Sequence, residues 1–201
     1  MPIVNRFAVM TDFWSHFPPK NTRTHEACGP SAPVFAAAFA GHLCGANGKM
    51  VFWLRESWQG VQLNPVGFAS YLDPKQLLIA QTARQIDALA AAEEALRSGH
   101  IALVVIELSQ RIGLTEGRRL QLAAQEGGAT GLCLLSEDMG SNAAQTRWRC
   151  TPVFDANGAA ADSTLQNWEI IKNKSGTLAN WNVEWHAQTR RINVVSKPAQ
   201  R

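Results

Sequence analysis

Apolar residues follow two alternating patterns through the middle of the chain. Short, continuous apolar runs predict strands that are covered on both faces, over residues 50–54, 76–80, 101–106 and 131–135. Longer segments that are Ala- and Phe-rich or carry one apolar face predict helices over residues 33–43, 84–98 and 115–125. Because these strands and helices alternate, we expect an α/β fold with right-handed crossovers and a mostly parallel sheet flanked by helices.

The pattern changes from Arg147 onward, where alternating stretches separated by turn signals replace the continuous apolar runs. Residues 147–154, 167–174 and 180–187 predict an antiparallel β extension at one edge of the sheet. We expect the tryptophans of these stretches to pack on the sheet rather than stack on bases, because they occupy alternating positions: Trp168, Trp181 and Trp185. We therefore predict an irregular lead-in over residues 1–24, one domain over 25–195 and a short tail over 196–201.

Composition narrows the class of protein. Hydrophobic residues make up 46% of the 201 residues and charged residues 17%, which excludes a disordered chain and requires a large core. The formal net charge is only +3, so bulk electrostatics give no reason to assign nucleic-acid binding. The first twenty residues lack the pattern of a secretory signal, and no apolar run approaches the roughly 20 residues that span a bilayer. We expect a cytoplasmic protein without membrane contact.

The residues that commonly bind metals lie too far apart in sequence to form a recognisable motif. Cys28, Cys44, Cys133 and Cys150 form no Cys-x-x-Cys pair, and the five histidines show no ligand spacing. We therefore expect buried free thiols and no metal site.

Ligands of open parallel sheets bind beyond the carboxyl ends of the strands, and several polar residues are expected there. Glu56, Glu107 and Ser136 each follow or end a predicted strand. A carboxylate in the position of Glu107 can hold a magnesium ion through water in a nucleotide enzyme. It can equally cap a neighbouring helix or face solvent, and the strand position alone favours this second interpretation.

The segment before the first helix lacks the residues that bind a triphosphate. A phosphate-binding loop needs Gly-x-x-x-x-Gly-Lys-Ser/Thr, whereas Gly29-Pro30-Ser31-Ala32-Pro33 has no lysine, no second glycine and two prolines without amide donors. A bare helix N-terminus favours an anion by about 0.3–1 kcal/mol, whereas even a millimolar complex needs roughly 4 kcal/mol. We expect no nucleotide cofactor and no catalytic residues.

Two basic clusters in the C-terminal stretches are candidate contacts for phosphates or for an acidic protein face. Arg147 and Arg149 share one side of a predicted strand, with Trp148 on the other, and Lys172 and Lys174 end the next strand. A solvated face is an equally good interpretation of the spacing.

Several segments, in their order along the chain, resemble the ATPase core of RecA recombinases. The resemblance runs from about Thr24 to Val195. Residues 24–30 look like the strand and Gly-Pro entry to the phosphate loop, residues 52–56 like the strand that delivers a water-polarising glutamate, and residues 98–108 like the Walker B strand. By this resemblance, Gly29, Pro30, Glu56, Glu107 and Ser136 are remnants of a nucleotide site. Residues 172–174 are similar to the Lys-Asn-Lys strand with which RecA contacts nucleotide across a filament interface.

The inducible mutagenesis protein A (ImuA) family of bacteria resembles the chain still more closely. Residues 118–124, 131–135 and 145–149 carry that likeness. The chain departs from RecA in lacking the phosphate-loop lysine and in having only short counterparts of the DNA-binding loops, at residues 109–114 and 137–142.

The ImuA resemblance implies a non-catalytic accessory role in damage-induced translesion DNA synthesis. The implied partners are an ImuB-like homologue of the Y-family polymerases and an error-prone DnaE-type polymerase, with RecA as a further candidate and with weak or indirect contact to DNA. One alternative is a SulA-like inhibitor of cell division, which shares the trimmed core. Another is an unconventional DNA-dependent ATPase that uses Glu56, Glu107, Lys172 and Lys174.

Overall fold

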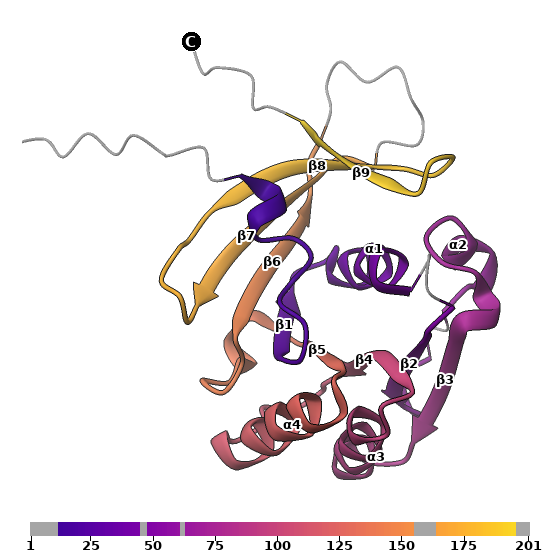
Figure 1. Cartoon of the computed structure of the whole chain (residues 1–201), viewed down its shortest axis with the longest axis vertical. Coiled ribbons are helices and arrows are strands. Elements are labelled where there is room, and N and C mark those ends of the chain that lie inside the picture. Colours follow the sequence, from indigo (N-terminus) through magenta and orange to yellow (C-terminus); the bar gives the residue numbers. More distant parts are fainter. Residues whose placement is uncertain (1–11, 45–47, 61–62, 155–163, 196–201) are drawn as a thin grey trace, which may run out of the picture.

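A single nine-stranded sheet, ordered β3-β2-β4-β5-β1-β6-β7-β8-β9, organises the computed structural model (Figure 1). The structure describes residues 12–44, 48–60, 63–154 and 164–195. The predicted 196–201 tail and the first eleven residues of the predicted lead-in lie outside the described residues. The strands are β1 (Thr24–Cys28), β2 (Met50–Glu56), β3 (Leu77–Thr82), β4 (Ile101–Glu107), β5 (Thr130–Leu134), β6 (Thr146–Pro152), β7 (Gln166–Asn173), β8 (Asn180–His186) and β9 (Arg191–Val195).

The sheet changes character at β6. Strands β1 to β5 pair in parallel, and β6 also runs parallel to β1, whereas β6 to β9 pair antiparallel with one another. The predicted mostly parallel sheet with an antiparallel C-terminal extension is therefore confirmed. The prediction missed β9, and it also missed the five-residue helix α2 (Pro65–Ala69).

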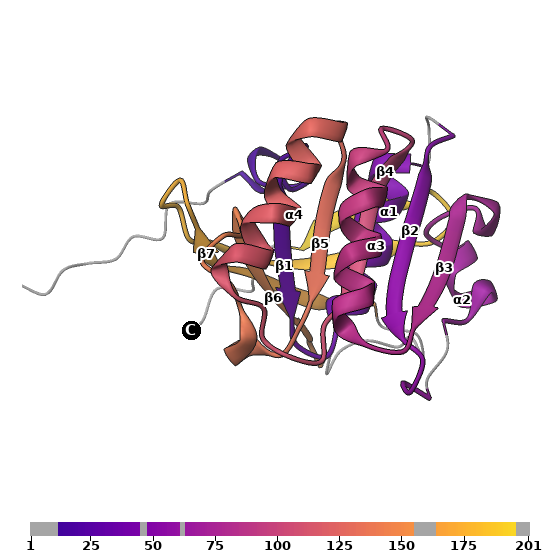
Figure 2. The same cartoon turned by 90° about the horizontal axis from the view of Figure 1, so that it is seen from below.

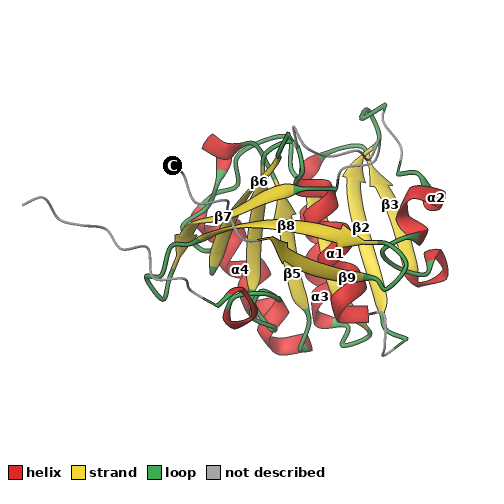
Figure 3. Cartoon of the chain, turned by 90° about the horizontal axis from the view of Figure 1, so that it is seen from above, coloured by secondary structure: helices red, strands yellow, loops and turns green. Residues whose placement is uncertain are grey.

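Helix α1 (Ala32–Cys44) lies inside the curl of the sheet. Figure 1 shows the parallel strands on one side of α1 and β8 and β9 on the other. In Figure 3, β8 and β9 lie in front of α1. Its buried residues are alanine, phenylalanine and cysteine on nearly all sides. This composition fits the position, because a helix that is apolar all round must be covered all round.

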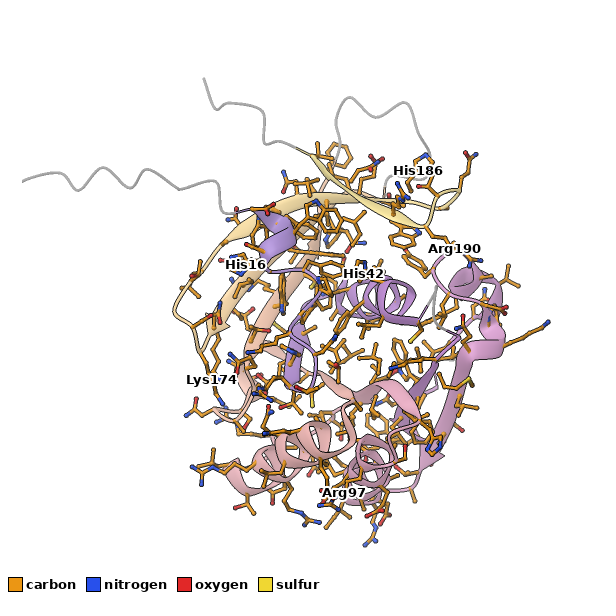
Figure 4. All side chains as sticks on the ribbon, viewed as in Figure 1. His16, His42, Arg97, Lys174, His186 and Arg190 are labelled. Atoms are coloured by element: carbon orange, nitrogen blue, oxygen red, sulfur yellow. The ribbon has the colours of Figure 1, made fainter. Side chains whose placement is uncertain are left out.

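The curl is held against α2 by contacts from the β8–β9 hairpin. Trp185 stacks on Tyr71 with ring centroids 4.6 Å apart, and its indole N–H donates to the carbonyl of Ser70 over 3.3 Å. The Arg190 guanidinium donates to the carbonyl of Ala69 over 3.0 Å, and Figure 4 shows it reaching towards the end of α2. The predicted packing of Trp168, Trp181 and Trp185 is confirmed, since all three are buried.

Two further helices cover the outer face of the parallel strands. They are α3 (Gln85–Arg97) and α4 (Leu114–Gly127), which lie side by side in Figure 2. Strand β4 shows why the apolar run was continuous: Leu103 and Val105 pack in the core around α1, while Val104 and Ile106 pack in the core under α3 and α4.

The described part of the lead-in is packed into the fold. Phe13 and Phe17 are buried in the core around α1, where the Phe17 ring lies 5.5 Å from that of Trp168. Residues 12–23 thus cover part of the inner core, and β1 begins at Thr24, one residue before the expected domain boundary.

Candidate functional site

A cleft of about 610 Å³ opens at the carboxyl edge of the parallel strands. Residues that end or follow β1, β2, β4 and β5 line it, together with the first turn of α1. This is where an open α/β sheet places its ligand. Of the predicted site residues, Gly29, Glu107 and Ser136 line the cleft, whereas Pro30 and Glu56 do not.

The connection from β1 to α1 is a tight turn of only three residues, Gly29 to Ser31. The Ser31 amide donates to the carbonyl of Cys150 over 3.1 Å, and the Ala32 amide donates to the carbonyl of Gly29 over 3.1 Å. Pro30 and Pro33 have no amide proton to offer. The amides of Ser31 and Ala32 are thus bound within the chain, whereas a phosphate loop would present such amides to an anion.

Glu107 is bound by two side chains of the neighbouring strand. Its Oε1 accepts from the Trp53 indole N–H over 2.7 Å, and its Oε2 accepts from the Arg55 guanidinium over 3.1 Å. Arg55 also donates to Gln59 over 2.9 Å. Glu107 thus neither caps a helix nor points freely into solvent, and it orients Arg55 along the cleft wall.

Glu56 lies on the opposite face of the sheet. It is buried, and its carboxylate accepts a short hydrogen bond from the Ser109 hydroxyl. Successive residues of a strand point to opposite faces, so Arg55 faces the cleft and Glu56 faces α3. Glu56 and Glu107 therefore do not converge on one reacting atom.

The four basic candidates are bound within the chain. Arg147 donates to Glu26 over 2.7 Å, and Glu26 is only 1% exposed. Arg149 bonds to both Glu137 and Glu169, whose hydrogen bonds raise the pKa of its guanidinium. As the strand pattern predicts, both arginines lie opposite the buried Trp148. Their positive charge is thus largely compensated before any external phosphate is considered.

The two lysines hold the segment between β5 and β6. The Lys172 ammonium donates to the carbonyls of Ser141 and Ala144 over 2.8 and 2.9 Å, and Lys174 donates to that of Ala143 over 2.6 Å. Lys172 is half-buried, which lowers the pKa of its ammonium. Figure 4 shows Lys174 at the edge of the molecule, beside this connection.

Comparison with known proteins places the fold and leaves the family open. No family model and no curated protein matches the sequence. The structure does match the crystal structure of the RadB recombinase, with a TM-score of 0.62 and 13% identity, over 88% of this chain and 92% of that chain. The chain has a RecA-like fold. At 13% identity, this match establishes architecture rather than activity.

The two segments that the resemblance assigns to DNA-binding loops, after β4 and after β5, are held by hydrogen bonds within the chain. In the segment after β4, the amides of Ser109 and Gln110 donate to the Gln85 side chain over 2.9 and 2.8 Å. In the segment after β5, the Ser141 amide donates to Glu26 over 2.7 Å. Ser141 and Ala143 also pack against Gly117 of α4, where even an added Cβ would lie 2.8 Å from both side chains.

Sequence reasoning missed two parts of this region. The ion pair between the buried Glu26 and Arg147 was not predicted. A carboxylate inside the buried strand Thr24–Cys28 needs a cationic partner, so the sequence did contain a signal for it. Gln59 and Leu63 also line the cleft and carry no sequence signal, because their place depends on the loop after β2.

The described residues contain no group of three or more His, Cys, Asp and Glu side chains that could hold a metal ion. All four cysteines are buried and free, as predicted, and burial raises the pKa of the Cys28 and Cys44 thiols to about 11. Among the described helices, none is long and apolar enough to cross a membrane.

Proposed function

We propose that this protein is a non-catalytic RecA-like accessory protein of the ImuA type, which acts in damage-induced translesion DNA synthesis by binding other proteins. The observation that carries the proposal is the three-residue turn between β1 and α1, whose Ser31 and Ala32 amides are used within the chain. The chain has a RecA-like sheet and a cleft at the carboxyl edge of its parallel strands. The turn at the position of a phosphate-binding loop, however, uses two of its amides for hydrogen bonds within the chain.

The contacts of the four residues named for an ATPase support the same choice. Glu56 is occupied by Ser109, Glu107 by Trp53 and Arg55, and both lysines by backbone carbonyls. An ATPase would have to use these groups on nucleotide, magnesium or water, in competition with the bonds that they already make within the chain. A binding protein can keep all of them.

The proposed partners are an ImuB-like homologue of the Y-family polymerases and an error-prone DnaE-type polymerase, with RecA as a further candidate. The test is affinity purification of the tagged full chain from cells treated with a DNA-damaging agent, with mass spectrometry of the bound proteins. We expect a Y-family-like polymerase homologue in the eluate, and none from a strain in which that gene is deleted. Recovery of the tubulin-like division protein instead would favour the SulA-like alternative and overturn the mutagenesis role.

A further inference from the structure

Strand β3 forms one edge of the sheet and is unprotected there. Among the described strands it pairs only with β2, in a register without a bulge, and Figure 1 shows it at the rim of the sheet, between α2 and α3. Its sequence, Leu77–Thr82, has no charged residue and no proline. Charges, prolines and bulges are the usual means by which an edge strand avoids pairing with another chain, so β3 is open to such pairing. Strand β9, at the opposite edge, carries the exposed cation Arg191.

Both faces of β3 present apolar side chains at this edge. Leu78 and Ile79 are each 46% exposed, and successive residues of a strand point to opposite faces. Leu77 packs against the core around α1 and Ala80 against the core under α3, which places Ile79 on the α1 face and Leu78 on the α3 face. A strand that joined β3 would therefore cover apolar surface on both faces.

The pairing with β2 fixes which backbone groups of β3 face outward. The Thr82 carbonyl accepts a hydrogen bond over 2.8 Å from the amide of the residue that follows β2, so it faces β2. Backbone groups of successive residues point to opposite sides, so those of Leu77, Ile79 and Gln81 face away from β2. The Leu77 amide is used by the preceding 3₁₀ turn. The Leu77 carbonyl and both groups of Ile79 and Gln81 have no partner among the described residues.

We propose that β3 pairs with β3 of a second copy of this chain, in antiparallel orientation, with Ile79 on the two-fold axis. An axis perpendicular to the sheet makes each face of the two sheets continuous across the contact. The two Ile79 residues then exchange both of their backbone hydrogen bonds, and each Gln81 amide donates to the Leu77 carbonyl of the other copy.

The side chains select this register. An axis at Ala80 would also pair outward backbone groups, but it would set each Ile79 opposite the polar Gln81. With the axis at Ile79, the two exposed isoleucines face each other and Leu78 lies opposite Ala80, so apolar side chains cover one another on both faces. The strand is thus complementary to itself, which favours a second copy over a foreign segment.

Charge does not oppose the pairing. Of the cations that flank β3 in sequence, Arg84 is paired with Asp87, which leaves Lys75. The formal net charge of +3 gives only weak repulsion between copies. Because the contact is one short strand from each copy, we expect a reversible dimer rather than an obligate one. This dimer does not depend on the proposed function.

Sedimentation equilibrium of the full chain, from micromolar to near-millimolar concentration, tests the association. We expect a reversible equilibrium between monomer and dimer. Ile79→Lys sets two ammonium groups opposite each other at the axis and should raise the dissociation constant by about tenfold or more. The control is Leu122→Lys, at a leucine of α4 that is 61% exposed, and it should dimerise as the wild type does. Circular dichroism and melting temperature establish that both variants are folded.

Engineered cysteines test the register. The two Ile79 Cα atoms should lie about 5.5 Å apart, within the range that a disulfide spans, so Ile79→Cys should form a covalent dimer on oxidation with diamide. A non-reducing gel measures this. Leu78→Cys is the control, because Leu78 is as exposed but lies diagonally across from its counterpart, and it should cross-link far less. The wild type accounts for the four native cysteines, which are buried.

A chain that stays monomeric over the whole concentration range would overturn the proposal, as would an Ile79→Lys variant that associates like the wild type. Stronger cross-linking of Ala80→Cys than of Ile79→Cys would overturn the register. Association that continues beyond the dimer would show that β3 joins a different edge, such as β9. Loss of association on deletion of residues 1–11 would assign the edge to that segment, and either result would overturn the symmetric pairing.

Discussion

The backbone amide of Ser31 donates its hydrogen bond to the carbonyl oxygen of Cys150, 3.1 Å away in β6. This bond joins the start of α1 to a strand that lies beside β1. It satisfies the Ser31 amide with a carbonyl of the sheet, at the position where a phosphate-binding loop would hold a triphosphate. A phosphate at this point would compete with a backbone hydrogen bond that the fold already makes.

Nucleotide binding should therefore be absent. We expect no heat of binding on titration of the full chain with Mg-ATP and no release of phosphate, because the turn has no lysine and its Ser31 and Ala32 amides already donate within the chain. Isothermal titration calorimetry and a phosphate-release assay check this. Micromolar affinity combined with turnover that Glu56→Gln abolishes would contradict it.

Replacement of Gly29 should destabilise the protein strongly. Gly29 has a φ of +90°, and a Cβ there would lie 2.5 Å from the carbonyl oxygen of Cys150. Backbone strain and steric overlap together should lower the free energy of unfolding of Gly29→Ala by about 3 kcal/mol. Gly48→Ala is the control, because Gly48 has a φ of +64° but open space around it, and should cost only about 1 kcal/mol. Urea denaturation measures both, and equal losses would show that the overlap contributes nothing.

Arg147→Ala should act on folding rather than on phosphate binding. It leaves the buried Glu26 carboxylate without its cation, and loss of one partner of a buried pair costs about 3–5 kcal/mol. The variant Glu26→Gln/Arg147→Ala should recover part of this loss, because it removes the stranded charge and keeps an acceptor for the Ser141 amide. Arg84→Ala, which breaks the exposed pair with Asp87, should change stability little. An unchanged melting temperature for Arg147→Ala would contradict the structural role.

His25 should make the protein less stable as the pH falls below neutrality. Its Nδ1 lies 2.7 Å from the Thr146 hydroxyl and its Nε2 lies 2.8 Å from the Lys20 carbonyl. Because that carbonyl can only accept, the neutral ring carries its proton on Nε2. Burial lowers the pKa of His25 to about 4, so between this value and about 6.5 the unfolded chain binds a proton that the folded chain does not.

The stability from neutral His25 is thus complete above the unfolded pKa and is lost as the pH falls towards the folded one, by roughly 3 kcal/mol in total. Urea denaturation across this interval should show a smaller slope with pH for His25→Gln than for the wild type. His42 contributes in the same direction, because burial lowers its pKa too, and His42→Gln controls for its share. An identical slope for His25→Gln and the wild type would contradict the prediction.

Periodicity in the sequence was sufficient to predict β2, β3, β4 and β5, because each carries its own apolar run, whereas the buried β1 contains Thr24, His25 and Glu26 and was indicated only by the resemblance to RecA. The β8–β9 hairpin was harder to predict: Arg191–Val195 has one buried residue, Ile192, and the strand exists because its backbone pairs with β8. The candidate site divides in a similar way. Topology brings Gly29, Glu107 and Ser136 to one cleft, whereas the alternation along β2 turns Glu56 to the other face, and a list of strand ends does not reveal this. Nor could spacing show that Lys172 is half-buried and bound to two carbonyls.

Helix α1 is enclosed by strands that follow it late in the chain, so it cannot be fully covered until those strands have been synthesised. Helix α1 leaves the ribosome early, but Trp181, Val183, Trp185 and Ile192, which complete the wall around its core, come more than a hundred residues later. Until they emerge, the Ala- and Phe-rich surface of α1 remains open to water and to other chains. The closing contacts are therefore among the longest in sequence separation, and the nascent protein depends on its last strands to hide its first helix.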